Sequence, residues 1–248
     1  MSFPASRRYV LLAAGFVALL PLLQSGRAYG APQETAQNSG KHMEMTALRP
    51  IQPGDQQRAA AIVAAARKVM DQYTDYRKAL ANGYAINLPG VKQGVYHFTR
   101  NVDFHENTTH FNPDRPTSLL YVKVSGPGLR YKLVGVMYTA PDGASEDELN
   151  QHIPLSIAQW HLHTDLCVPP AGEKVDLHGP DAKFGFEGSI VTADACQAAG
   201  GRFVPHFFGW MVHVYPYETD AKKIWSTDDD DQGHDNMDRS AMPGMKMN

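Results

Sequence analysis

The sequence predicts an α+β fold in which one long N-terminal helix packs on a mostly antiparallel β-sheet, with disordered arms at both ends. Three observations indicate this fold: a stretch over 56–81 that is rich in Ala and long polar residues and lacks Gly and Pro, short alternating runs after Gly83, and polar sequence at both ends. The chain has 248 residues, 43% of them hydrophobic, which suffices for one sizeable core. Its net charge of −3 gives no general reason to expect nucleic-acid binding.

The first 30 residues have the pattern of an export signal. Arg7-Arg8 precedes an apolar run over 9–23, and Ala28-Tyr29-Gly30 marks a small-residue cleavage site before Ala31. The run is shorter than the roughly 20 residues that a membrane-spanning helix needs. The paired arginines fit either an ordinary export signal or a twin-arginine signal, which carries folded proteins. We therefore expect a periplasmic or secreted protein with no stable membrane insertion after cleavage.

The remaining chain divides into three predicted parts. Residues 31–53 are polar and lack apolar periodicity, so a flexible arm is expected there. Residues 54–219 form a single α+β domain. Residues 220–248 are rich in Met, His and Asp and are expected to be a disordered tail.

The stretch over 56–81 is predicted to be one helix. Its apolar residues recur at spacings of three, four or seven and form one stripe, which comprises Ile62, Val69, Met70, Tyr73, Tyr76 and Leu80. Asp55 can cap the start of this helix, and Asn82-Gly83 ends it.

Five strands are expected after this helix. They cover residues 94–99, 118–124, 130–139, 158–168 and 207–217. A Gly- and Pro-containing turn over 125–129 joins the second and third strands as a hairpin. Residues 140–150 are an acidic loop or a short helix, and the Gly-rich segment over 173–188 is expected to be a loop.

Cys167 and Cys196 are the only cysteines. In an exported protein an even pair most often forms a structural disulfide. The alternatives are that Cys167 is a metal ligand beside His161 and His163, or that it is a nucleophile.

Four histidines lie on predicted strands, each on the face opposite to its most apolar neighbours: His97, His161, His163 and His213. If they converge, they make a three- or four-ligand metal site, for which imidazole suits Zn, Cu, Fe and Ni alike. If they do not converge, they are hydrogen-bonded structural residues. His206 is the best further ligand, because it leads directly into the strand that carries His213.

Six of the nine methionines after the initiator lie in the two predicted arms: Met43, Met45, Met237, Met242, Met245 and Met247. Core packing, the usual role of Met, does not explain this placement. Thioether sulfur is a soft ligand that selects Cu(I). His42 and His234 add imidazole beside these methionines, a pairing suited to copper in both oxidation states.

Two resemblances add to this interpretation. Residues 237–245, Met-Asp-Arg-Ser-Ala-Met-Pro-Gly-Met, resemble the Met-rich segments of periplasmic copper-resistance proteins, which repeat a Met-Asp-His-Ser-x-Met-Pro-Gly-Met phrase. Here Arg239 replaces the His and the phrase occurs once. Separately, stretches at 94–98, 112–116, 160–169 and 208–216 resemble a group of uncharacterised secreted bacterial proteins over most of residues 90–217. That second resemblance implies one domain and carries no activity.

The sequence thus predicts an exported metal-binding protein for copper capture or tolerance, with zinc or iron as alternative metals. The Met/His tails would capture ions, and a site of His161, His163 and His213, with His97, would hold one in the fold. Its partners would be the metal ion and other copper-handling proteins. The alternatives are a metalloenzyme of the oxygenase or hydrolase type at the same site, and a small-ligand-binding module with structural histidines. No phosphate loop, nucleophile elbow or zinc-protease helix motif supports another reaction.

Overall fold

The chain divides into two units, Met1–Gln33 and Glu34–Asn248, and every residue described below belongs to the second. The computed structural model describes residues 37–227 except 41, 88, 90–92, 108–109, 129, 173–174, 176 and 178–180. The predicted export signal over 1–30 and the predicted tail from residue 228 onward lie outside the described residues.

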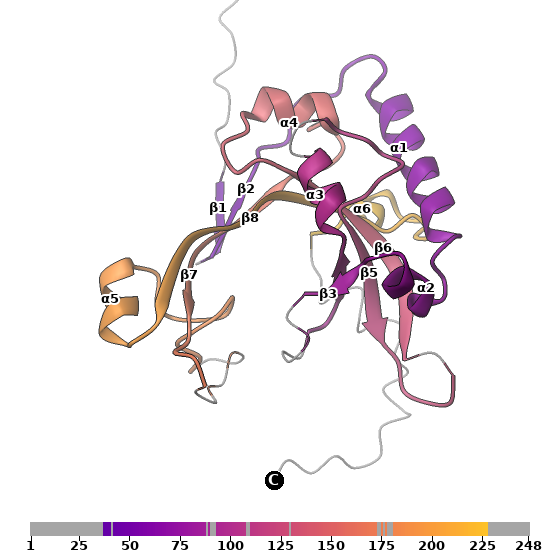
Figure 1. Cartoon of the computed structure of the whole chain (residues 1–248). Helices are drawn as coiled ribbons and strands as arrows, with labels where there is room; N and C mark the ends of the chain where they lie inside the picture. Colours follow the sequence, from indigo (N-terminus) through magenta and orange to yellow (C-terminus); the bar gives the residue numbers. More distant parts are fainter. Residues whose placement is uncertain are drawn as a thin grey trace, which may run out of the picture. The chain divides into compact units, whose positions relative to one another are not determined.

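Eight strands form one sheet in the order β1-β2-β7-β8-β6-β5-β4-β3 (Figure 1). The strands are β1 (Gln37–Gly40), β2 (Met43–Met45), β3 (Ala85–Ile86), β4 (Tyr96–Thr99), β5 (Ser118–Lys123), β6 (Tyr131–Ala140), β7 (His161–Val168) and β8 (Arg202–Val214). Every pair of neighbouring strands in this sheet is antiparallel. The five predicted strands correspond to β4 through β8. β4, β7 and β8 show the two-residue repeat of a pleated strand, whereas β5 and β6 are apolar runs joined by a turn.

The predicted fold class is wrong in its helical part, since the described chain is mostly sheet and has no long N-terminal helix. Its helices are α1 (Asp55–Met70), α2 (Tyr76–Ala81), α3 (Asn101–Asn107), α4 (Glu146–His152), α5 (Ala193–Ala198) and α6 (Ala221–Ile224). The helix expected over 56–81 is interrupted after Met70. Tyr73 in the gap is buried against Tyr84, and the Asp75 side chain accepts a hydrogen bond from the Arg77 N–H, which starts α2 as a separate helix.

The predicted flexible arm over 31–53 also differs from the structure. Within it, β2 pairs with β7, and His42, Thr46 and Ala47 are buried. A polar segment can become a strand when the edge of a neighbouring strand supplies backbone hydrogen bonds, and such pairing is invisible in the segment's own sequence. At the other end, α6 lies inside the predicted tail over 220–248.

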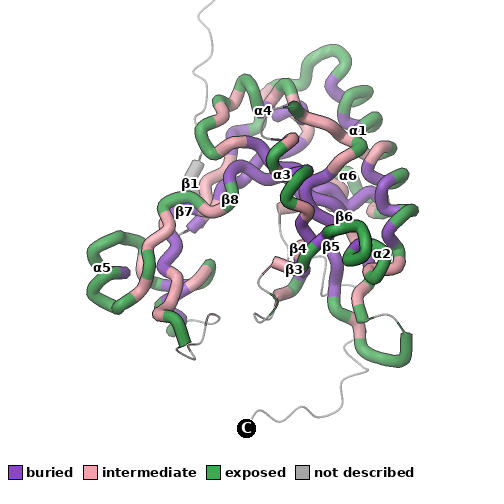
Figure 2. Tube along the Cα trace, viewed as in Figure 1, coloured by how far each residue is buried: buried purple, intermediate pink, exposed green. Residues whose placement is uncertain are grey.

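The two faces of the sheet carry different side chains. One face packs against α1 in the main core, which includes Ile62, Met70, Trp160, Tyr138 and Val212. Figure 2 shows buried residues along β5, β6 and the C-terminal part of β8, and alternating buried and exposed residues along α1. The other face carries a second cluster, made of Val95, Leu120, Val122, Met137, Met211 and Tyr215.

Strand β8 bends between the part that pairs with β7 alone and the part that also pairs with β6. Phe208 and Gly209 have φ values of 71° and 117°, and the pairing with β7 shifts between His161 and His163. A bulge of this kind turns a strand and increases its twist. Gly209 suits the bend because a Cβ atom there would lie 2.5 Å from the Ala140 carbonyl oxygen.

Candidate functional site

Four histidine rings lie one after another in space along the second face of the sheet. The ring centroids of His163 and His161, both on β7, are 5.4 Å apart. The His161 ring lies 5.0 Å from that of His213 on β8, and the His213 ring lies 5.3 Å from that of His97 on β4. We call these four residues the histidine row. The structure therefore brings together all four strand-borne histidines that the sequence singled out.

Strand alternation places these rings on one face. Trp160 just before β7, Leu162 on β7, and Trp210 and Val212 on β8 all belong to the main core on the other face. The histidines between them must point the opposite way, as the sequence predicted.

The contact between His97 and His213 shows that the sheet curves around this face. Their Nε2 atoms are 3.4 Å apart, although β5 and β6 separate β4 from β8. On a flat sheet, strands three places apart are about 14 Å from each other. The curvature brings into contact two side chains that lie far apart in the sequence.

The separation of these two nitrogens fits two kinds of interaction. One imidazole can donate a hydrogen bond to the other when a single ring nitrogen carries the proton. Two imidazole nitrogens bound to one tetrahedral zinc-like ion are also about 3.3 Å apart, given metal–nitrogen bonds of about 2.0–2.1 Å. The pair can therefore provide two ligands to a metal with little movement.

The histidine row is buried in the middle and partly accessible at its ends. His161 and His213 are only 1% and 2% exposed, whereas His97 and His163 are half-buried. A ligand that reaches the row from solvent would meet one of the end residues first.

Methionines stand directly opposite histidines on neighbouring strands. Met45 and Met43 on β2 pair with His161 and His163, respectively. Met211 on β8 pairs with His161. The sequence interpretation put Met43 and Met45 in a flexible arm, and the structure places them beside the histidine row. Met-Glu-Met alternates as His-Leu-His does, but this match fixes neither the partner strand nor the register, so the sequence offers no signal for the pairing.

No three His, Cys, Asp or Glu side chains form a group that could hold a metal ion within the part of the chain that the structure describes. Met237, Met242, Met245 and Met247, which the sequence proposed as further ligands, lie outside the described residues.

Two other histidines near predicted ligands have different partners. The ring nitrogens of buried His42 lie 3.2 Å from the Thr164 carbonyl oxygen and 2.7 Å from the Gly188 carbonyl oxygen. His42 is thus engaged by the backbone, contrary to the expectation that it captures copper with Met43. His206 is exposed and pairs with Asp142 at 3.0 Å, and this hydrogen bond lowers the pKa of Asp142.

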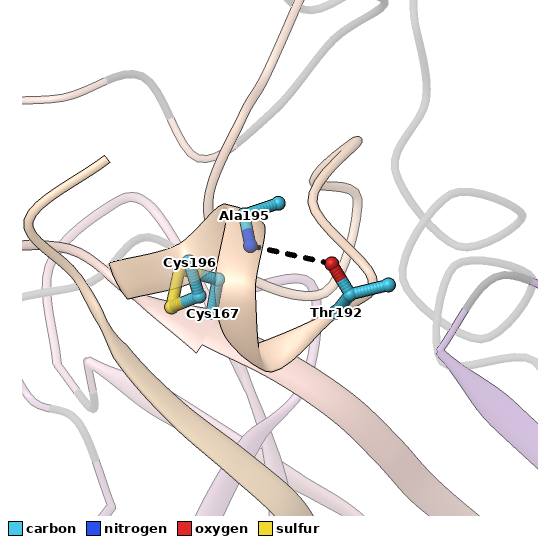
Figure 3. Close-up of a disulfide and its surroundings, with 4 residues drawn as sticks. All are labelled: Cys167, Thr192, Ala195 and Cys196. Atoms are coloured by element: carbon cyan, nitrogen blue, oxygen red, sulfur yellow. Dashed lines mark hydrogen bonds between the residues drawn. A yellow bond between two sulfur atoms is a disulfide. The ribbon is translucent and has the colours of Figure 1, made fainter. Parts of the chain in front are cut away.

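Cys167 and Cys196 form a disulfide, as the sequence predicted (Figure 3). Both residues are buried, and the bond ties α5 to β7. Thr192 caps the start of α5 by accepting a hydrogen bond from the Ala195 N–H at 3.3 Å. The disulfide rules out Cys167 as a thiolate ligand or nucleophile in this structure.

Sequence reasoning missed a buried ionic network between α3 and β5. Asp103 is fully buried and accepts hydrogen bonds from Arg100 Nε at 2.5 Å and Arg115 Nε at 3.0 Å. Asn107, also fully buried, donates to the carbonyl oxygens of Asp103 and Arg115. Glu106 forms a further ion pair with Arg115, so two carboxylates match two guanidinium groups. The network therefore stabilises the fold and offers no unused charge to a ligand.

Comparisons with known proteins return no match: no protein-family model, no curated protein and no solved structure is similar to this chain. Among the described residues, none of the helices has the length and apolar character needed to cross a membrane.

Proposed function

We propose that this chain is an exported copper-binding protein that serves copper capture or tolerance. The observation that carries the proposal is the histidine row, and above all the 3.4 Å separation of the His97 and His213 Nε2 atoms. Support for copper in particular comes from the Met-rich sequence over 237–247, and support for export comes from residues 1–30.

Imidazole nitrogen binds Cu(II) and Zn(II) in its neutral form, so the His97–His213 pair suits either divalent ion. The half-buried His97 is the accessible member of the pair, and the buried His213 is held by its strand among apolar neighbours. An ion bound here would be shielded from solvent on the His213 side and accessible from the His97 side.

Calorimetric titration of the full chain with Cu(II), and separately with Zn(II), tests the proposal. His97→Ala and His213→Ala should each remove one equivalent of bound metal. His110→Ala, which changes an exposed histidine outside the row, should leave the titration unchanged. Thermal unfolding of each variant checks that the fold is kept.

The 3.4 Å contact also favours a second interpretation, in which the histidine row is a metal-free hydrogen-bonded network that stabilises the sheet. In that case His97→Ala would lower the unfolding temperature and leave metal uptake unchanged. That combination of results would reject the copper proposal.

A further inference from the structure

We infer that Met45 and Met211 are thioether ligands that act together with His161, and that this part of the histidine row takes Cu(I). The inference rests on the proposed function, because it names the oxidation state of the ion and further ligands at the same face of the sheet.

The strand register places the three donors in one line across the sheet. His161 on β7 stands directly opposite Met45 on β2 and directly opposite Met211 on β8. Directly opposite residues of antiparallel strands share a face, with Cβ atoms about 4.5–5.5 Å apart. His161 is therefore flanked by a thioether on each side, one from each neighbouring strand.

The other contacts on this face agree with the register. Met211 and Tyr215 belong to the same buried cluster. His213 lies between them in the sequence with the same two-residue spacing, and its ring contacts that of His161. Met45 is half-buried and stands opposite the buried His161. The three donors thus run from a partly accessible position to a fully buried one.

The chemistry of this donor set selects a soft, singly charged ion. Two thioethers and one imidazole are all neutral ligands, and thioether sulfur binds without losing a proton. Burial penalises net charge, so an apolar site made of neutral donors holds a monovalent ion at lower cost than a divalent one. Cu(I) satisfies both conditions.

The competing explanation is that these methionines only fill space. Met211 is 3% exposed in an apolar cluster, which is the usual setting for a packing methionine. Packing alone predicts that Leu replaces either residue with little effect, because Leu–Met exchanges cost less than about 1.5 kcal/mol. Ligation predicts instead that Leu abolishes a specific affinity for Cu(I).

The test uses the full chain with its four tail methionines, Met237, Met242, Met245 and Met247, replaced by Leu, so that only the folded part reports. Cu(I) affinity is measured without oxygen by competition with a colorimetric Cu(I) chelator. Met45→Leu and Met211→Leu should each weaken Cu(I) binding by about tenfold or more and leave Zn(II) uptake at the His97–His213 pair unchanged. Met70→Leu is the matched control, because Met70 is buried in the main core on the helix-covered face.

X-ray absorption at the copper edge gives an independent readout, since sulfur neighbours should be detected in the parent chain and reduced in each Met variant. Unchanged Cu(I) affinity in both Met variants, together with loss of Zn(II) in His97→Ala, would overturn this inference and leave the proposed function standing. Unchanged binding of every metal in the His and Met variants alike would overturn both. If Met211→Leu unfolds, the half-buried Met45→Leu decides the question by itself.

Discussion

At the scale of single residues, His152 is an imidazole whose charged form the fold disfavours. Its ring stacks on Phe111 with centroids 5.2 Å apart, and burial lowers the pKa of His152 against a smaller opposing effect of Glu148. Because the folded pKa lies below that of the unfolded chain, about 6.5, His152 contributes fully to stability above that pH, and the contribution is lost as the pH falls through 6.5 towards the folded pKa. His152→Phe should therefore reduce the loss of stability between about pH 7.5 and about pH 5, measured by urea unfolding.

The matched control for this prediction is His110→Phe. His110 is exposed, so its replacement should leave the pH dependence of the unfolding free energy as it is in the parent chain. If both variants changed the slope of the unfolding free energy against pH equally, His152 would not be a specific source of the acid sensitivity.

Asp103 is a residue whose charge the fold depends on. Its carboxylate is fully buried between Arg100 and Arg115, so Asp103→Asn would leave Arg100 without its carboxylate and Arg115 with Glu106 alone. The expected cost is about 3–5 kcal/mol, measured as a shift in the chemical unfolding midpoint. The same change at exposed Asp114, whose ion pair with Lys68 spans 3.8 Å, should cost no more than about 0.5 kcal/mol. Similar small effects at both positions would show that the buried network is dispensable.

At the scale of secondary-structure elements, the bend in β8 depends on Gly209. Ala at this position would require a side chain at φ 117° and would place its Cβ atom 2.5 Å from the Ala140 carbonyl oxygen. Gly209→Ala should therefore destabilise the fold by at least about 1–3 kcal/mol and weaken metal binding at the histidine row, because the bend sets the position of β8 between β6 and β7. Gly143→Ala is the control, since a Cβ atom there would meet nothing within 4 Å. Thermal unfolding and Zn(II) titration of both variants give the comparison, and equal behaviour would contradict this role of Gly209.

The elements also show how far sequence reasoning reaches in this protein. Strands β4, β7 and β8 were predictable from alternation, as in His161-Leu162-His163, and β5 and β6 from apolar runs joined by a Gly- and Pro-containing turn. The helix over 56–81 was mispredicted because no Gly or Pro marks the break, and α2 begins separately where the Asp75 side chain caps it. Strand β2 was missed because its strand form arises from pairing with β7 and not from its own composition.

The sequence was enough to predict which histidines form the candidate site, but not how they are arranged in space. Alternation alone put His97, His161, His163 and His213 on the faces opposite to the core. Their contact depends on the curvature of the sheet, which brings β4 towards β8, and on a register shift between His161 and His163. The methionine partners of His161 depend on the register of β2, and no local pattern encodes that register.

At the scale of the whole molecule, the copper proposal assigns separate tasks to the sheet and to the C-terminal sequence. Met237, Met242, Met245 and Met247 supply four thioethers within eleven residues of sequence, a density of soft ligands that suits capture of Cu(I). His161 with its flanking methionines supplies a buried position that suits retention. Capture and retention then differ in the ligands that they use, so they are separable by substitution.

Replacing the four C-terminal methionines by Leu should lower the number of Cu(I) ions that the full chain binds, while the tightest site keeps its affinity. The reason is that loss of soft ligands removes only the positions that those ligands form. Chelator competition without oxygen measures both quantities in one titration. The control changes Asp228, Asp229, Asp230 and Asp231 to Asn, because carboxylates are hard ligands and their loss should leave Cu(I) uptake unchanged. An unchanged Cu(I) count in the Leu variant would remove the C-terminal methionines from copper capture, and an equal fall in the Asn variant would assign the uptake to negative charge.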